Sequence, residues 1–152
     1  MIEFNKILVP VVGTDADDEA IRLACQLAKK NKGKIWAIYV ITVRRSLPLD
    51  AQIESEIRKA EEVLDHAQRV AEEEEYELET ELLQAREAGP TIVDEAVERE
   101  VDLILMGAEH KRRFGQFSLG SVLPYVLKNA PCRVILYHQY TTINTLRTEL
   151  SR

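Results

Sequence analysis

The chain has 152 residues, of which 45% are hydrophobic and 30% charged, and such proportions are typical of one soluble globular domain. Acidic residues outnumber basic residues by 26 to 20, which argues against a nucleic-acid-binding protein because such proteins are usually basic. The apolar runs have only strand length, and the first residues lack the pattern of a signal peptide. We therefore expect a cytoplasmic protein without direct membrane insertion.

The first half of the chain alternates between predicted strands and helices. A nearly continuous β-branched run over 6–12 predicts a strand that is covered on both faces. A helix is expected over 14–31, because apolar residues follow a helical period there and acidic residues occupy the first turn. A second apolar strand is predicted over 34–43. After a polar connection, apolar spacings of three and four predict a long helix over 51–75.

The second half continues the alternation. Polar and apolar residues alternate over 77–84, which is typical of a half-exposed edge strand. A short helix is expected to start at Gly89-Pro90, where proline is tolerated in the first turn. A buried strand over 103–106, a helix over 118–129 and a last strand over 132–137 complete the predicted elements.

This order of elements predicts the fold class. Five strands alternate with helices without an internal repeat or a break in composition. Each helix can therefore serve as a right-handed crossover in a mainly parallel sheet. We expect one α/β domain over residues 1–138. Residues 139–152 fit neither period, and we interpret them as a C-terminal tail that is either mobile or an arm for a partner.

Neither the cysteines nor the histidines indicate a metal site. Cys25 and Cys132 lie in apolar patterns, which is typical of buried thiols. Neither has a second cysteine at metal-binding spacing, and His66, His110 and His138 are scattered along the chain. From these spacings we predict no bound metal. No nucleophile or paired acid accompanies His110, so we also predict no enzymatic activity.

Residues 102–122 combine the features of an anion-binding segment. A predicted strand over 103–106 ends just before Gly107, a basic loop follows, and a helix is expected to begin at Ser118 or at the pair Gly120-Ser121. The free N–H groups and the positive dipole end of a helix N-terminus favour phosphate. Glycine allows a ligand to approach the backbone closely. The alternative is structural, with the glycines serving only to end the strand and start the helix.

The same segment resembles the glycine motif of the universal stress protein family, Gly-x2-Gly-x9-Gly-Ser/Thr. Gly107 and Gly120-Ser121 match this motif, whereas His110 replaces its second glycine. Residues 122–136 also resemble the family, in which a helix leads through Ala-Pro-Cys into a last strand. The start of the chain resembles it as well, so that the likeness covers roughly residues 4–138.

The resemblance implies a doubly wound sheet with the strand order 3-2-1-4-5 and helices on both faces. Ligands of such sheets bind beyond the carboxyl ends of the strands where the order reverses. By resemblance, the protein is a regulatory module of the stress response that binds ATP or a related adenine nucleotide in that crevice. The residues that would touch the base, the ribose or the phosphates are Pro10, Val11, Val12, Val40, Met106, Gly107, His110, Gly120, Ser121 and Val122.

Two departures from the family pattern predict weakened binding. Val12 stands where the family has an Asp that binds the ribose, and losing a hydrogen bond of about 1.5–3 kcal/mol weakens binding roughly ten- to a hundredfold. His110 would cost about 1–2 kcal/mol if its position requires a positive φ. The basic residues 111–113 would attract a polyphosphate, or they form a solvated loop. Val12 and Val40 are interpreted as core residues with or without a ligand.

The alternative function is that of a nucleotide-independent interaction protein that kept the fold and lost the ligand. Such a protein could act with a membrane transporter, because residues 44–50 resemble variants of the domain that are attached to transporters. Both interpretations predict a homodimer. The strand over 132–138 is apolar and lies at a sheet edge, where it needs a cover, and members of the family pair this strand across a two-fold axis.

Overall fold

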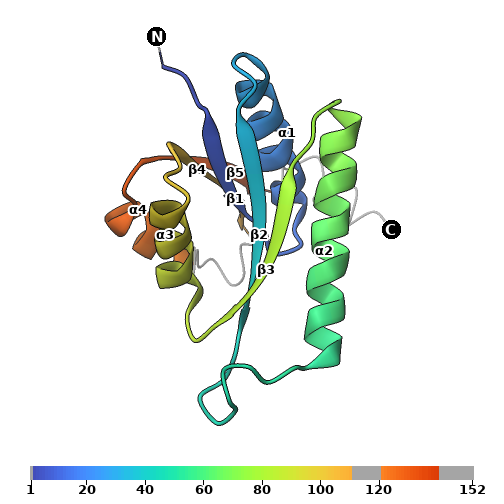
Figure 1. The fold of residues 1–152 in the computed structure, drawn as a ribbon, viewed down its shortest axis with the longest axis vertical. Helices are drawn as coiled ribbons and strands as arrows, with labels where there is room; N and C mark the ends of the chain where they lie inside the picture. The colour runs from blue at the N-terminus through green and yellow to red at the C-terminus, as the bar shows by residue number, and fades with distance from the viewer. Residues whose placement is uncertain (1, 111–120, 141–152) are drawn as a thin grey trace, which may run out of the picture.

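Strands and helices alternate along the described part of the chain, residues 2–110 and 121–140 of a computed structural model (Figure 1). The elements in order are β1 (Lys6–Pro10), α1 (Asp15–Lys29), β2 (Lys34–Thr42), α2 (Glu54–Glu73), β3 (Glu79–Ala85), α3 (Ala88–Glu98), β4 (Leu103–His110), α4 (Val122–Asn129) and β5 (Arg133–Tyr140). Among the described residues no helix is long and apolar enough to cross a membrane.

The five strands form one sheet with the order β3-β2-β1-β4-β5, as predicted. Every pair of neighbouring strands is parallel. β1 lies at the centre, where Ile7 pairs with Ile35 of β2 on one side and with Leu103 of β4 on the other. The direction of winding therefore reverses between β1 and β4, which is the position where ligands of such sheets usually bind.

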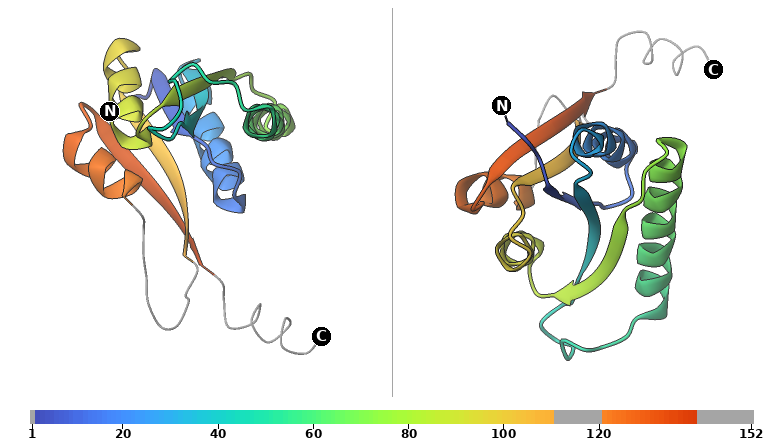
Figure 2. Two further views of the ribbon diagram at one scale, coloured as in Figure 1. Left: turned by 90° about the horizontal axis from the view of Figure 1, so that it is seen from below. Right: turned by 45° about the horizontal axis from the view of Figure 1, so that its top comes forward.

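Helices cover both faces of the sheet (Figure 2). On one face α1 and α2 pack on strand residues such as Ile7 and Val9, and on the other face α3 and α4 pack on residues such as Leu8 and Ile104. Neighbouring side chains of a strand point to opposite faces. The strands at the centre of the sheet must therefore be apolar at successive positions, which explains the nearly continuous apolar runs in the sequence.

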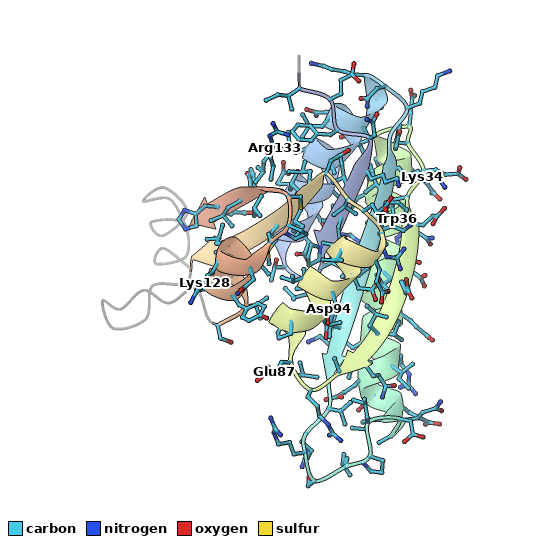
Figure 3. All side chains as sticks on the ribbon, turned by 60° about the vertical axis from the view of Figure 1, so that its left-hand side comes forward. Lys34, Trp36, Glu87, Asp94, Lys128 and Arg133 are labelled. Carbon is cyan, nitrogen blue, oxygen red and sulfur yellow. The ribbon has the colours of Figure 1, made fainter. Side chains whose placement is uncertain are left out.

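Trp36 closes the core on the α3 side of β2 (Figure 3). Its Nε1 donates a hydrogen bond to Glu79 Oε2 of β3 over 2.8 Å. The guanidinium of Arg99, directly after α3, lies 5.4 Å from the ring centroid and also pairs with Glu81 and Glu95. These contacts join the end of α3 to β2 and β3.

β1 is shorter than the strand over 6–12 that the β-branched run predicted. It ends at Pro10, although the amide of Val11 still donates to the carbonyl of Ile38 over 2.9 Å. Gly13 then turns the chain with a φ of +99°, a conformation that favours glycine. As a result Val12 is 61% exposed, and its assignment to the core was wrong.

β4 and β5 are longer than predicted. They continue as parallel partners from Gly107 and Tyr137 to His110 and Tyr140. Gly107 therefore lies inside β4 and does not end it. The backbone of His110 is extended, so the cost that a positive φ would impose at this residue does not arise. β5 passes the boundary at which the tail was expected, and residues 141–152 lie outside the described part of the chain.

Candidate functional site

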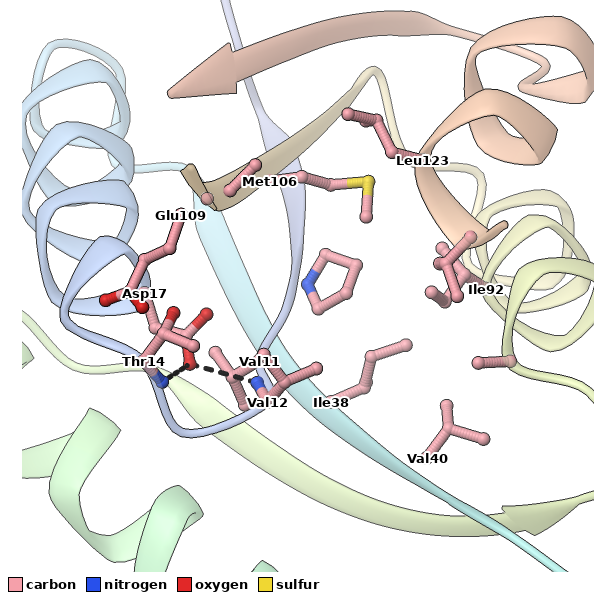
Figure 4. A pocket seen from close by; sticks show the side chains of 15 residues that line it. Val11, Val12, Thr14, Asp17, Ile38, Val40, Ile92, Met106, Glu109 and Leu123 are labelled. Carbon is pink, nitrogen blue, oxygen red and sulfur yellow. Dashed lines mark hydrogen bonds between the residues drawn. The ribbon is translucent and has the colours of Figure 1, made fainter. Parts of the chain in front are cut away.

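A cleft of about 420 Å³ opens at the carboxyl ends of β1, β2 and β4, where the strand order reverses (Figure 4). The N-terminal residues of α3 and α4 face the same cleft. The lining residues are Pro10, Val11, Val12, Thr14, Asp17, Ile38, Val40, Ala88, Ile92, Met106, Gly107, Ala108, Glu109, Val122 and Leu123.

One wall of the cleft is apolar. Ile38 and Val40 come from β2, Ile92 from α3, Met106 from β4 and Leu123 from α4, and Figure 4 shows their side chains around the same space. Four of these side chains are buried in the core between the sheet and α3 and α4, and Val40 packs against that core. The side chains of this wall are therefore held in place by the core and offer a hydrocarbon surface, which suits a flat, weakly polar group.

Seven of the ten residues implied by the family resemblance line this cleft: Pro10, Val11, Val12, Val40, Met106, Gly107 and Val122. Ser121 is exposed just before α4 and is not among the lining residues. The side chain of His110 and the whole of Gly120 lie outside the described residues, as do the basic residues 111–113.

Gly107 has a packing role in the cleft. A Cβ at this position would lie 2.5 Å from the carbonyl oxygen of Ala16 and 2.6 Å from its carbonyl carbon. Both atoms belong to the backbone of α1 and cannot turn aside. The residue must be glycine for α1 to pack this closely on β4, whether or not a ligand is present.

The other end of the cleft is polar, and its centre is Asp17 in the first turn of α1. Its side chain is almost completely buried, with 3% of the residue exposed. Oδ2 accepts hydrogen bonds from the amides of Val12 (2.9 Å), Gly13 (2.7 Å) and Thr14 (3.0 Å). Burial raises the pKa of the Asp17 carboxyl above its ordinary value, although the three hydrogen bonds act in the opposite direction.

Glu109 of β4 stands beside Asp17. Its Oε1 accepts a hydrogen bond from the amide of Asp15, the first residue of α1, over 3.1 Å. Glu109 can reach this amide because β4 continues past Gly107, and alternate residues of a strand point to the same face. The two carboxylates thus hold the junction between β1 and α1.

Sequence reasoning placed acidic residues in the first turn of the helix over 14–31, but it assigned neither Asp17 nor Glu109 to the site. Asp17 follows Thr14, the N-cap residue of α1, by three residues, a spacing at which a side chain can reach back to the preceding backbone. That spacing was a usable signal for Asp17. Glu109 had none, because the predicted strand ended at Met106 and left the residue in a loop.

A second hollow of about 190 Å³ lies between α1 and α2, on the opposite side of the loop after β1. His66 Nε2 and Asp18 Oδ2 are 2.9 Å apart at its edge. Within the described residues no group of three or more His, Cys, Asp or Glu side chains is arranged to hold a metal ion.

A parallel sheet with the order β3-β2-β1-β4-β5, helices on both faces and a cleft at its reversal point is a doubly wound α/β domain. The model of the universal stress protein family matches residues 3–138, and the chain therefore belongs to this family. A universal stress protein of Methanocaldococcus jannaschii is 35% identical over 139 residues, which cover 88% of this chain and 81% of that protein.

Solved structures agree with this assignment. A universal stress protein from Lactobacillus plantarum is 27% identical with a TM-score of 0.71, and the match covers 90% of this chain and 99% of that chain. The universal stress protein from Archaeoglobus fulgidus, solved in complex with dAMP, is 25% identical with a TM-score of 0.70. That match covers 89% of this chain and 98% of the other.

Proposed function

We propose that this universal stress protein is a regulatory module that binds an adenine nucleotide in the cleft between β1, β2 and β4. One observation carries the proposal: seven residues that the family resemblance implied, from β1 and the loop after it, β2, β4 and α4, line a single cleft. Its volume of about 420 Å³ lies within the range of small-molecule sites. The complex of the relative from Archaeoglobus fulgidus with dAMP supports the choice of ligand.

The proposed ligand would place its base on the apolar wall. Val40 and Met106 offer hydrocarbon surface there, whereas polar groups gather at the start of α1. An adenine ring buries a large apolar area and needs few hydrogen bonds for affinity. A cleft with one apolar wall and one polar end therefore suits a nucleoside. The protein would act through the bound or free state of the cleft and not through catalysis.

Calorimetric titration of the purified protein with adenosine, AMP, ADP and ATP tests the proposal. The variant Val40→Glu places a charge in the apolar wall, and we expect it to weaken binding at least about tenfold because the charge must be desolvated. Val97→Glu is the matched control. Val97 is 56% exposed on α3 and does not line the cleft, so its variant should bind like the parent.

A protein that binds none of these four ligands at millimolar concentration would contradict the proposed function. The alternative is then an interaction protein without a nucleotide, which the exposed Val12 favours because it offers no carboxylate to a ribose. The double variant Val12→Asp with His110→Gly distinguishes the two. Under the alternative it gains binding that the parent lacks.

A further inference from the structure

Four successive backbone amides at the junction of β1 and α1 are bonded to carboxylates of the chain itself. The amides of Val12, Gly13 and Thr14 donate to Asp17 Oδ2, and the amide of Asp15 donates to Glu109 Oε1. The four distances lie between 2.7 and 3.1 Å. All of these amides border the cleft or adjoin residues that line it.

Such a run of amides is normally a place for an external anion. A turn with successive N–H groups at a helix N-terminus binds phosphate or carboxylate because the amides and the helix dipole both favour negative charge. In this protein the carboxylates of Asp17 and Glu109 accept the hydrogen bonds that these amides could donate to an external anion. A ligand phosphate would have to displace Asp17, which is almost completely buried and holds three hydrogen bonds.

The two carboxylates also give this end of the cleft a negative charge. Asp17 and Glu109 both line the cleft, and none of the described lining residues is Lys, Arg or His. A fixed unit charge at about 8 Å, with an effective dielectric constant of about 40–80, changes the affinity for each further unit charge about two- to sixfold. Every added phosphate of a nucleotide therefore meets repulsion from these two carboxylates.

We propose that Glu109 determines the ligand class, so that the cleft takes adenosine or a nucleoside monophosphate in preference to ATP. Asp17 occupies three amides at the start of α1, so that a phosphate cannot bind to them, and Glu109 repels the charge of a polyphosphate. The acceptor oxygens at this end suit a ligand group that donates hydrogen bonds, such as a ribose hydroxyl. The inference rests on the proposed function, because it concerns the same cleft and the same adenine ligands.

The test compares the affinities of adenosine, AMP, ADP and ATP by calorimetry without divalent cations, for the parent and for Glu109→Gln. The amide oxygen of Gln can still accept the bond from Asp15, so the variant changes the charge and keeps the contact. We expect the parent to bind AMP more tightly than ATP. In Glu109→Gln the affinity for ATP should rise at least about tenfold more than that for adenosine, since ATP carries the largest charge.

Glu98→Gln serves as the matched control, because it makes the same change in net charge. Glu98 is exposed at the end of α3 that lies away from the cleft, and its variant should leave the order of affinities unchanged. Tighter binding of ATP than of AMP by the parent would overturn the inference and leave the proposed function standing. An equal gain for adenosine and ATP in Glu109→Gln would do the same. Failure of all four ligands to bind would overturn the proposed function itself.

Discussion

Gly107 of β4 lies so close to Ala16 of α1 that a Cβ at residue 107 would come within 2.5 Å of the Ala16 carbonyl oxygen. We expect Gly107→Ala to lower the free energy of unfolding by about 1–3 kcal/mol, the usual cost of overpacking, because α1 must move away from the sheet. Urea denaturation without nucleotide measures this loss.

Ser121→Ala is a suitable control for this prediction. Ser121 belongs to the same glycine motif, but it is exposed and its side chain makes no cap bond to α4. Its variant should therefore keep the stability of the parent. If Gly107→Ala unfolds like the parent and only loses affinity for nucleotide, the residue serves the ligand and not the packing.

The strand order and the position of the cleft were predictable from the sequence. Ile7, Leu8 and Val9 are fully buried, and successive apolar residues of this kind occur in strands that are covered on both faces. The alternation of strands with helices limits the topology further, and the family resemblance supplied the order. Once the order is known, the reversal point and the apolar residues beside it follow.

The polar end of the cleft was not predictable in the same way. Glu109 reaches α1 only because β4 continues through Gly107, and pairing with β5 supports that continuation. Such pairing is a long-range contact that leaves no local pattern. Val12 was misassigned for a related reason: the valine run suggested a strand, whereas the turn at Gly13 exposes the residue.

The buried carboxyl of Asp17 predicts an unusual dependence of stability on pH. Burial raises its pKa, so the folded protein holds this proton more tightly than the unfolded chain. Stability from this source is therefore complete below the unfolded pKa of about 4 and is lost as the pH rises through the folded pKa. The parent should lose stability relative to Asp17→Asn over that range of pH.

Urea denaturation of the parent and of Asp17→Asn at several pH values between about 3.5 and 7 measures this difference. Asp50→Asn, at an exposed position in the connection before α2, removes the same charge and corrects for the general effect. A parent that instead gains stability relative to Asp17→Asn as the pH rises would show that the three amide hydrogen bonds outweigh burial and lower the pKa.

The Cys25 thiol should be almost inert in the folded protein. Burial raises its pKa to about 11, and the nearby Glu74 adds to the effect. At pH 8 only about one thiol in a thousand is then a thiolate, the form that reacts with alkylating agents. Cys132 is only half-buried, and we expect iodoacetamide to label it first.

Peptide mass spectrometry after timed alkylation measures both rates. In urea the two cysteines should react alike, because unfolding removes the burial that separates them. Labelling of Cys25 as fast as Cys132 in the folded protein would contradict the packing of α1 on the sheet.

The position of β5 predicts a homodimer. Within the described residues β5 is the last strand of the sheet and pairs with β4 on one side, and we expect its other side to be the place for a partner. A second copy of the chain is the expected partner, since an open apolar edge favours pairing with another strand. Light scattering should give twice the chain mass of 17.4 kDa at micromolar concentration.

The variant Leu136→Lys places a charge in the middle of β5, and we expect it to shift the protein to the monomer because a lysine on an edge strand disfavours pairing with another strand. Leu49→Lys makes the same change at an exposed residue of the connection between β2 and α2, and it should remain dimeric. Thermal unfolding checks that both variants are folded. A parent that stays monomeric throughout the micromolar range would show that β5 is not the dimer edge, and the cover of this strand would then have to come from another source.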